Sequence, residues 1–356
     1  MAGRKKMKKS TRSNLMTFGF VIAFWALIEI VRMTGHMTAK IGGLLIPVCA
    51  YVVMAISLNL VVGFLGELSL GHAAFMSAGA FAGIYFYTTA GAALPQWLAV
   101  LIAFLIGGAA AGIFGVLVGI PVLRLSGDYL AIVTLASGEI LKNVLGAMYI
   151  GSDSRGLHFS LKDQFSLGME PDGKMLLKGA MGIMGIKKFS VFTVGIVLIL
   201  ITLIFVTNLM NSRAGRAITA IRDDEIAARA TGINLTKYKL MAFVSAAVFA
   251  GFAGVLYALN YSSLVADKFD YNLSINVLVM VVLGGMGNVL GGIIAAIILT
   301  VLPEMLRGFS QYRMFIYSIV LIVMMLFNQA PAFVSWRKRF MMRFRKKAPV
   351  SGKEGI

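Results

Sequence analysis

Charged residues are scarce in this sequence. Lys, Arg, Asp and Glu make up 13% of the 356 residues, whereas hydrophobic residues make up 59%, and the mean hydropathy is +0.86. Because soluble domains average about 25% charged residues, this composition excludes an ordinary soluble protein and leaves little chain for a separate soluble domain. We expect an all-α polytopic membrane protein with a single transmembrane domain over residues 1–356, since helices satisfy their own backbone groups in lipid.

Acidic residues are scarcer than basic ones. Asp and Glu number 15 and Lys and Arg number 33, which gives a net charge of +18. In a membrane protein, such an excess usually lies in cytoplasmic loops and meets anionic lipid. We therefore expect contact with membrane lipid and no binding of nucleic acid. The basic tail RKRFMMRFRKK (337–347) carries interleaved Phe and Met and is expected to lie on the inner leaflet.

Residues that make catalytic and metal sites are few. Cys49 is the single cysteine, which excludes an intrachain disulfide, and the three histidines, His36, His72 and His158, lie far apart in the chain. A zinc site commonly needs several such ligands together, and no Ser–His–Asp arrangement stands out. We expect no metal site, no catalytic residues and no enzymatic activity.

A segment with phosphate-loop spacing does not predict a nucleotide site. Residues 168–174 have the glycine and lysine spacing, but Met175 follows where Ser or Thr would hold magnesium. The segment also lies in a predicted external loop with no strand before it. We expect this chain to bind no cofactor.

Apolar runs of about 20 residues, the length of one bilayer crossing, recur along the chain. About ten such spans are expected, some of them broken or re-entrant. They lie near 14–33, 41–63, 68–89, 96–120, 128–150, 189–210, 240–261, 273–285, 288–306 and 312–330. The span count is ambiguous in two charge-free stretches, 68–123 and 271–303. The first is divided at AALPQ (92–96) and the second at GGMGNVLGG (284–292).

The distribution of Lys and Arg predicts the orientation. With ten spans, both termini lie on one side, and nearly two thirds of the basic residues lie on that side. By the positive-inside rule this side is cytoplasmic. It holds a basic N-terminal tail (1–13), a polar loop (211–239) and a basic C-terminal tail (331–356). The long loop 151–188, in which acidic residues accompany the basic ones, is expected to be external.

The polar loop contains a predicted short helix. Asp223, Asp224 and Glu225 lie where negative charge suits the positive end of a helix dipole, alanines follow, and Gly232 suits a helix stop. Such a helix between two spans is suited to docking in a groove of a soluble partner. The alternative is an ordinary solvated loop.

Several stretches resemble one protein family in composition and order. They are EIAA (225–228), TG (231–232), KYKLMAFVSAAVFAGFAG (237–254), SLNLVVGFLGELSLGHAAFMSAGAFAG (57–83), GDYLAIVTLASGEILKNVL (127–145), GSDSRGL (151–157) and GGMGNVLGGIIAA (284–296). Together they resemble the permeases of ATP-binding-cassette importers, and more narrowly the branched-chain amino acid permeases of the LivM type. The loop departs from the general Glu-Ala-Ala pattern by an inserted isoleucine and preceding aspartates.

This resemblance implies a bacterial inner-membrane importer with separate subunits. A second permease would form a heterodimer with this chain, two ATPase subunits would bind ATP and magnesium, and an external binding protein would deliver leucine, isoleucine or valine. Carried over by position, the polar loop would be the coupling loop. Its coupling residues would be Asp224, Glu225, Ala228 and Gly232, with Gly232 turning the chain back without steric penalty.

Two glycine-broken segments follow similar tetrapeptides. SLNL (57–60) precedes the segment from Gly63 to Gly71, and SINV (274–277) precedes the segment from Gly284 to Gly292. Transporters often build substrate sites from broken helices in two repeats, although four residues also match by chance. If the echo is real, the candidates to line the translocation path are Asn59, Ser69, His72, Asn276 and Asn288. For His72, a hydrogen-bonded interior histidine is the slightly favoured alternative.

Glu139 and Lys142 lie in one span at i and i+3, where they can form a pair on one helix face. Charges in lipid are costly and usually face a bundle interior or water. Two interpretations stand equally: Glu139 contributes to a polar lining for a zwitterionic substrate, or the pair is structural and merely neutral. Small residues at four-residue spacing, such as Gly79 with Gly83, are expected to pack helices closely.

Two other classes of function remain open. A self-sufficient secondary transporter driven by an ion gradient would share the ten spans and broken helices, but it would more often have buried carboxylates as ion sites. A membrane assembly or anchoring subunit would need no broken helices.

Overall fold

The computed structural model of this chain consists mainly of helices. It describes residues 3–34, 39–125, 127–153, 156–168, 173–189, 191–309 and 312–329. The predicted basic tail 331–356 lies outside the described residues. The chain divides into two compact units, Met1–Val301 and Leu302–Ile356, and each is described by itself.

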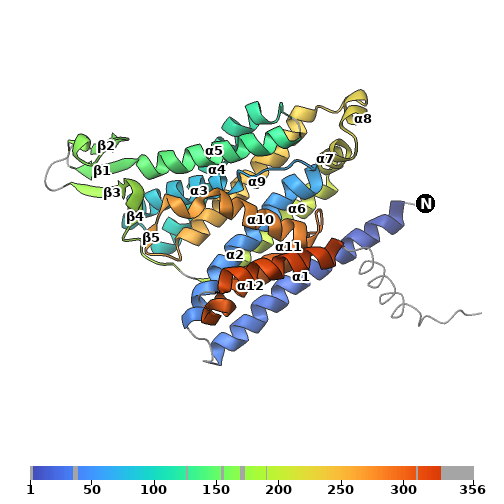
Figure 1. The fold of residues 1–356 in the computed structure, drawn as a ribbon, viewed down its shortest axis with the longest axis horizontal. Coiled ribbons are helices and arrows are strands. Elements are labelled where there is room, and N and C mark those ends of the chain that lie inside the picture. Colours follow the sequence, from blue (N-terminus) through green and yellow to red (C-terminus); the bar gives the residue numbers. More distant parts are fainter. Residues whose placement is uncertain are drawn as a thin grey trace, which may run out of the picture. The chain divides into compact units, whose positions relative to one another are not determined.

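The first unit holds the main helix bundle (Figure 1). Its helices are α1 (Gly3–Met33), α2 (Ala39–Asn59), α3 (His72–Thr88), α4 (Gln96–Val122), α5 (Asp128–Ala147), α6 (Phe192–Asn211), α7 (Arg213–Asp223), α8 (Glu225–Ala230), α9 (Leu235–Ala258), α10 (Tyr271–Gly284) and most of α11 (Val289–Met305). A π-helical segment, η1 (Leu60–Leu65), continues α2. The described part of the second unit contains the end of α11 and α12 (Arg313–Gln329).

Six helices among the described residues are long and apolar enough to cross a membrane. These spans are Leu15–Met33, Ile41–Leu65, Gln96–Val122, Asp128–Ala147, Phe192–Asn211 and Leu235–Ala258. They coincide with predicted spans and confirm a polytopic membrane protein. The other predicted spans are shorter helices: the one expected at 68–89 begins only at His72, and α10 and α11 are separated by the predicted break.

The loop expected at 151–188 contains strands that the sequence analysis did not predict. Strands β1 (Tyr149–Asp153), β2 (Gly156–Ser160) and β3 (Lys174–Lys178) form an antiparallel sheet in the order β2-β1-β3. Its β1–β3 register shifts between Ile150 and Gly151. A second pair joins β4 (Ile183–Met184) to β5 (Ser263–Leu264), the segment after α9. These ladders satisfy backbone groups outside the helices.

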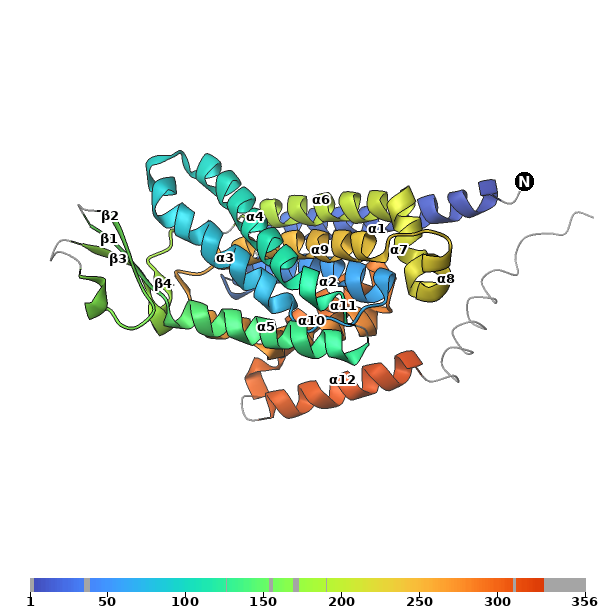
Figure 2. The same cartoon turned by 90° about the horizontal axis from the view of Figure 1, so that it is seen from above.

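The strands and the polar loop lie at opposite ends of the first unit. Figures 1 and 2 both show β1–β4 at one end of the bundle and α7 and α8 at the other, and Figure 1 shows β5 beside β4. We call these the β end and the polar-loop end. That the 151–188 and 211–239 loops lie on different sides of a membrane stays a prediction.

Helices α3, α4 and α9 form the core of the bundle through close glycine contacts. A Cβ on Gly79 would lie 2.3 Å from the Cα of Gly251, and a Cβ on Gly254 would lie 2.0 Å from the carbonyl oxygen of Met76. The α4 glycines Gly108, Gly112, Gly115 and Gly119 likewise face side chains of α9. The predicted small-residue pairs therefore pack helices, because no larger side chain fits there.

Candidate functional site

The first glycine break (63–71) begins in the π-helical turn that ends α2. Gly66 terminates this turn with φ +83, a left-handed conformation that glycine adopts without penalty. A Cβ on Gly66 would also lie 2.7 Å from Cγ of Arg222. π-Helical segments are rare and frequent at functional sites.

Side chains from other helices hold the start of α3 just after this break. Thr134 of α5 accepts a hydrogen bond through Oγ1 from the Leu70 N–H at 3.1 Å. Ser274 of α10 accepts through Oγ from the Ala73 N–H at 2.9 Å. Ser274 satisfies a backbone donor that the start of α3 leaves unpaired, and Thr134 satisfies one within the break, so α5 and α10 help to fix this part of the chain.

Three of the predicted path residues are buried around the first break. His72 Nε2 lies 2.8 Å from Oγ of Ser57, so the structure has the interior, hydrogen-bonded histidine that the sequence slightly favoured. Asn59 and Ser69 are each only 1% exposed. Among the described residues, Asn59 Nδ2 and Ser69 Oγ have no hydrogen-bond partner. Buried polar atoms without partners are uncommon and mark sites that need an explanation.

The second glycine break (284–292) separates α10 from α11 and contacts the first. Gly285 and Gly287 have φ +90 and +77, which lets the chain turn between the helices. Asn59 accepts a hydrogen bond through Oδ1 from the Gly287 N–H at 2.9 Å. A Cβ on Gly63 would lie 2.3 Å from that same nitrogen. The two breaks predicted from the sequence are therefore in direct backbone contact.

The other two asparagines of the predicted path are exposed in this chain. Asn276 lies on α10 beside the exposed Ile275. Asn288 caps the start of α11, because its Oδ1 accepts from the Gly291 N–H at 3.3 Å. In the predicted repeat Asn59 corresponds to Asn276, but Asn59 is buried and Asn276 is exposed. Ser57 and Ser274, which also correspond to each other, both contact the start of α3.

A polar cavity of about 390 Å³ lies beside the contact between the breaks. This size falls in the lower part of the range for small-molecule pockets. Its lining comes from α1, η1, α6, α7 and the second break. Polar members of the lining are Thr17, Thr207, Asn211, Thr219, Arg222 and Asn288. Of the predicted path residues, only Asn288 contributes to it.

The polar loop forms the predicted short helix together with a helix that was not predicted. Asp224 caps α8, because its Oδ1 accepts from the Ile226 and Ala227 N–H groups at 2.9 Å each. Gly232 follows α8 with φ +82, which confirms the predicted stop. Helix α7 precedes it and starts at a Ser212 cap. On α8, Ala228 is buried and Ile226 is 83% exposed.

Charged side chains connect the polar loop to the first break. Lys239 Nζ lies 2.6 Å from Glu67 Oε1 and 3.0 Å from Glu225 Oε2. Arg222 donates through Nη1 to the carbonyl oxygen of Gly63 at 3.3 Å. Residues of the polar loop therefore bind the first break at two places, at Gly63 and at Glu67. Of these contact residues, the sequence analysis had singled out only Glu225 for a role in the loop.

Sequence reasoning missed Lys239 for a physical reason. By its place in the sequence, directly before an apolar segment, it looks like an ordinary basic loop residue, yet it is 3% exposed. A buried lysine requires a nearby carboxylate, and Glu67 is the last charged residue before a long charge-free stretch. The isolated position of Glu67 was the signal available in the sequence. The sequence alone does not tell which basic side chain pairs with Glu67.

Glu139 forms contacts at the β end instead of lining the cavity near the breaks. It forms an ion pair with Lys142, and its other carboxylate oxygen accepts from the Tyr271 N–H at 3.1 Å. The pair therefore connects α5 to the start of α10. This geometry favours the structural interpretation of the pair.

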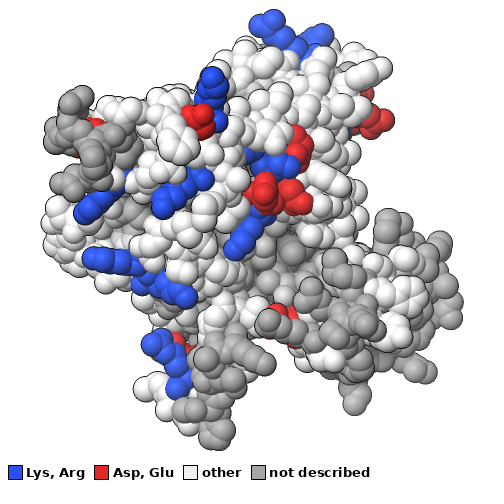
Figure 3. Space-filling model, turned by 60° about the vertical axis from the view of Figure 1, so that its left-hand side comes forward, with Lys and Arg blue, Asp and Glu red and all other residues white. Residues whose placement is uncertain are grey.

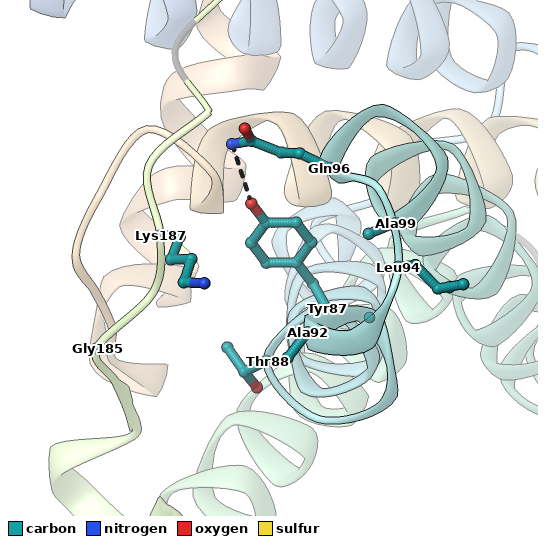
Figure 4. Close-up of a pocket in the computed structure, with 9 residues that line it drawn as sticks. Tyr87, Thr88, Ala92, Leu94, Gln96, Ala99, Gly185 and Lys187 are labelled. Atoms are coloured by element: carbon teal, nitrogen blue, oxygen red, sulfur yellow. Dashed lines mark hydrogen bonds between the residues drawn. The ribbon is translucent and has the colours of Figure 1, made fainter.

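A smaller pocket of about 190 Å³ lies at the β end (Figure 4). Gln96 donates through Nε2 to the Tyr87 hydroxyl at 3.5 Å, and Lys187 and Gly185 line the opposite side. It contains none of the predicted path residues. Among the described residues there is also no group of three or more His, Cys, Asp or Glu that could hold a metal ion.

Comparisons with known proteins agree with this arrangement. A family model described as branched-chain amino acid transport system / permease component matches residues 40–328. The LivM high-affinity branched-chain amino acid transport system permease proteins of Salmonella typhimurium and Escherichia coli are each 36% identical to this chain. In both cases the match covers 78% of this chain and 66% of the relative. The chain thus spans about two thirds of the length of these relatives.

No solved structure matches the chain significantly. The family match extends from α2 to α12 and includes both glycine breaks and the polar loop. Members of such a family are membrane components rather than enzymes, as the sequence predicted. The chain belongs to the family of permease components of branched-chain amino acid transport systems.

Proposed function

We propose that this chain is the transmembrane permease subunit of an ATP-binding-cassette importer in a bacterial cytoplasmic membrane. With a second permease it forms the path for leucine, isoleucine and valine. An external binding protein delivers the substrate, and two separate ATPase subunits bind ATP and magnesium. Both termini and the polar loop lie in the cytoplasm, and the β end lies outside. Family membership and the resemblance of the LivM proteins support this proposal.

The observation that carries the proposal is helix α8. It is a capped helix at the polar-loop end, attached to the bundle through the buried Ala228 and presenting Ile226 almost fully exposed. A large apolar side chain on a short exposed helix suits insertion into a groove of a soluble partner. Asp224 fixes the start of this helix, and Gly232 turns the chain back toward α9. In this proposal α8 is the coupling helix that the ATPase receives.

The translocation path runs along the exposed surface that holds Asn276 of α10 and Asn288 of the second break. Asn276 and Asn288 are exposed in this chain, and polar groups facing lipid are unfavourable. A second permease packed on this face would shield them and leave a polar path between the subunits. Asn59, Ser69 and His72 lie behind this face and shape the first break. Glu139 stands farther away, at the external entrance.

The β end suits docking of the external binding protein. Leu157, Phe159 and Phe165 are exposed there, Phe165 to 93%, and exposed apolar patches mark interaction sites. The described lysines of this region are Lys162, Lys174, Lys178, Lys187 and Lys188. Figure 3 turns this side forward and shows Lys and Arg side chains spread across it, with acidic side chains gathered among them. Charged groups on such a surface direct association with a partner of complementary charge.

The half-buried carboxylates Glu67 and Glu139 fit an importer better than a gradient-driven carrier. Such a carrier needs acidic groups free to bind an ion or proton. Glu67 is paired with Lys239 and Glu139 with Lys142, which neutralises both groups.

Purification and reconstitution test the proposal. The chain is tagged in its host, solubilised gently and analysed for co-purifying proteins, and the recovered complex is placed in proteoliposomes. We expect a second permease, two ATPase subunits and leucine uptake that needs ATP and the binding protein. Valine, isoleucine, amides and urea are compared as competitors. Active uptake by the single chain in response to an ion gradient would sink the importer proposal.

A further inference from the structure

Lys239 connects three elements that are far apart in the sequence. It lies near the start of α9 and contacts Glu67 of the first break and Glu225 of α8. Its side chain is 4% exposed, and that of Glu67 is 13% exposed. An ion pair with this burial is costly to separate, because each charge would be left without water or partner. This pair therefore holds α9 against the first break, and Glu225, whose side chain is 40% exposed, attaches α8 to the same lysine.

A second set of contacts reinforces this connection. Arg222, at the end of α7, donates to the Gly63 carbonyl, and its side chain lies against Gly66. Beneath these polar contacts, apolar side chains of η1, α7, α8 and α9 form one buried cluster. The cluster contains Leu60, Leu65, Ile218, Ile221, Ala228, Leu235 and Ala242. Displacing α8 alone would expose this surface, so α8 and η1 move most easily as one body.

The connection extends from the first break to the second. Asn59 directly precedes η1 and accepts the hydrogen bond of the Gly287 N–H. A displacement of η1 therefore acts on the turn between α10 and α11. Glycines with left-handed backbone stand on both sides of this contact, at Gly66 and Gly287, where the chain can change direction without side-chain hindrance.

We propose that Lys239 is a positioning residue that transmits displacement of α8 to the two glycine breaks. This inference rests on the proposed function, in which an ATPase acts on α8. Lys239 touches neither substrate nor nucleotide in this scheme. It couples ATP hydrolysis to opening of the path. When α8 moves, Glu225 displaces Lys239, and Lys239 displaces Glu67 of the first break.

The test uses the complete transporter in proteoliposomes and measures ATP hydrolysed per substrate molecule transported. Lys239→Met removes the connection but leaves the Glu67 carboxylate without its lysine, whereas Glu225 keeps its ion pair with Arg229. The triple variant Glu67→Gln, Lys239→Met, Glu225→Gln removes the connection without leaving any of these charges. Arg32→Met breaks an ion pair contained within α1 and serves as the matched control. Lys239→Arg retains the charge and tests for rescue.

We expect Lys239→Met and the triple variant to hydrolyse about tenfold more ATP per transported molecule, a typical size for a lost coupling interaction. The Arg32→Met complex should keep the wild-type ratio, and Lys239→Arg should recover most of it. The ratio is measured per assembled complex, so a reduced yield does not prevent the measurement. A wild-type ratio in the triple variant overturns the role of Lys239. A wild-type complex without ATP-driven uptake instead overturns the proposed function.

Discussion

The two glycine breaks differ in how the rest of the chain holds them. The first is mostly buried or half-buried, with Gly66 and Leu68 exposed; it is bonded to α5, α7 and α9, and α10 bonds to the start of α3 directly after it. The second is partly exposed and is held mainly by its own turn, by the Asn288 cap and by one contact to Asn59. A rigid break can transmit a displacement, whereas a lightly held break can respond to it. The contrast suggests different tasks for two segments that look alike in sequence.

The largest expected effect is a loss of folding stability when a glycine of the first break is replaced by alanine. The same change in the second break serves as the comparison. In Gly63→Ala the new Cβ would lie 1.9 Å from Asn59 Oδ1 and 2.3 Å from the Gly287 nitrogen. Overpacking of this kind costs about 1–3 kcal/mol, and the backbone neighbour places this variant at the upper end. Gly292→Ala meets nothing within 4 Å and should be neutral. Thermal unfolding in detergent measures the unfolding midpoints of both variants. Equal midpoints would show that the two breaks do not differ in how tightly they are held.

An intermediate effect is expected for the two asparagines of the sequence echo. Asn59→Ala leaves the half-buried Gly287 N–H without its acceptor, which costs about 1–3 kcal/mol. Asn276→Ala removes an exposed side chain and should leave the unfolding midpoint unchanged. In uptake assays, however, Asn276→Ala should still reduce transport if the path runs along that face. Wild-type uptake by Asn276→Ala would move the path elsewhere.

The smallest effect on stability is expected at Gly232. Its φ is +82 and a Cβ there would meet nothing within 4 Å, so Gly232→Val costs only the left-handed backbone, about 1–2 kcal/mol. Gly185, at the β end, has φ +75 and equally open surroundings, which makes Gly185→Val a matched control. We expect similar abundance for both variants and impaired uptake only for Gly232→Val. Equal uptake by the two would show that the turn after α8 has no part in coupling.

Features with a local physical cause were predictable from the sequence. Apolar length gave the long spans, because the bilayer sets that length. The acidic residues at its start and the Gly232 stop gave α8, because they complement the helix dipole and reverse the backbone locally. The glycine breaks were visible for the same reason.

Features that depend on long-range contacts were not predictable. The sequence does not show that Lys239 reaches Glu67, nor that Asn59 bonds to Gly287, since residues distant along the chain meet only in the fold. The sheet of β1, β2 and β3 was missed because its strands are short and β2 exposes Leu157 and Phe159, the reverse of the usual hydrophobic pattern.

The pairing of Glu67 with Lys239 also bears on how the chain is made. Glu67 leaves the ribosome long before α9 does, so during synthesis its carboxylate has no lysine partner. An unpaired carboxylate disfavours entry into lipid, which keeps the segment between α2 and α3 at the water boundary while later helices are inserted. Arrival of α9 then completes the pair and the surrounding cluster together. The buried lysine thus makes final assembly of the bundle a late, concerted event in membrane insertion.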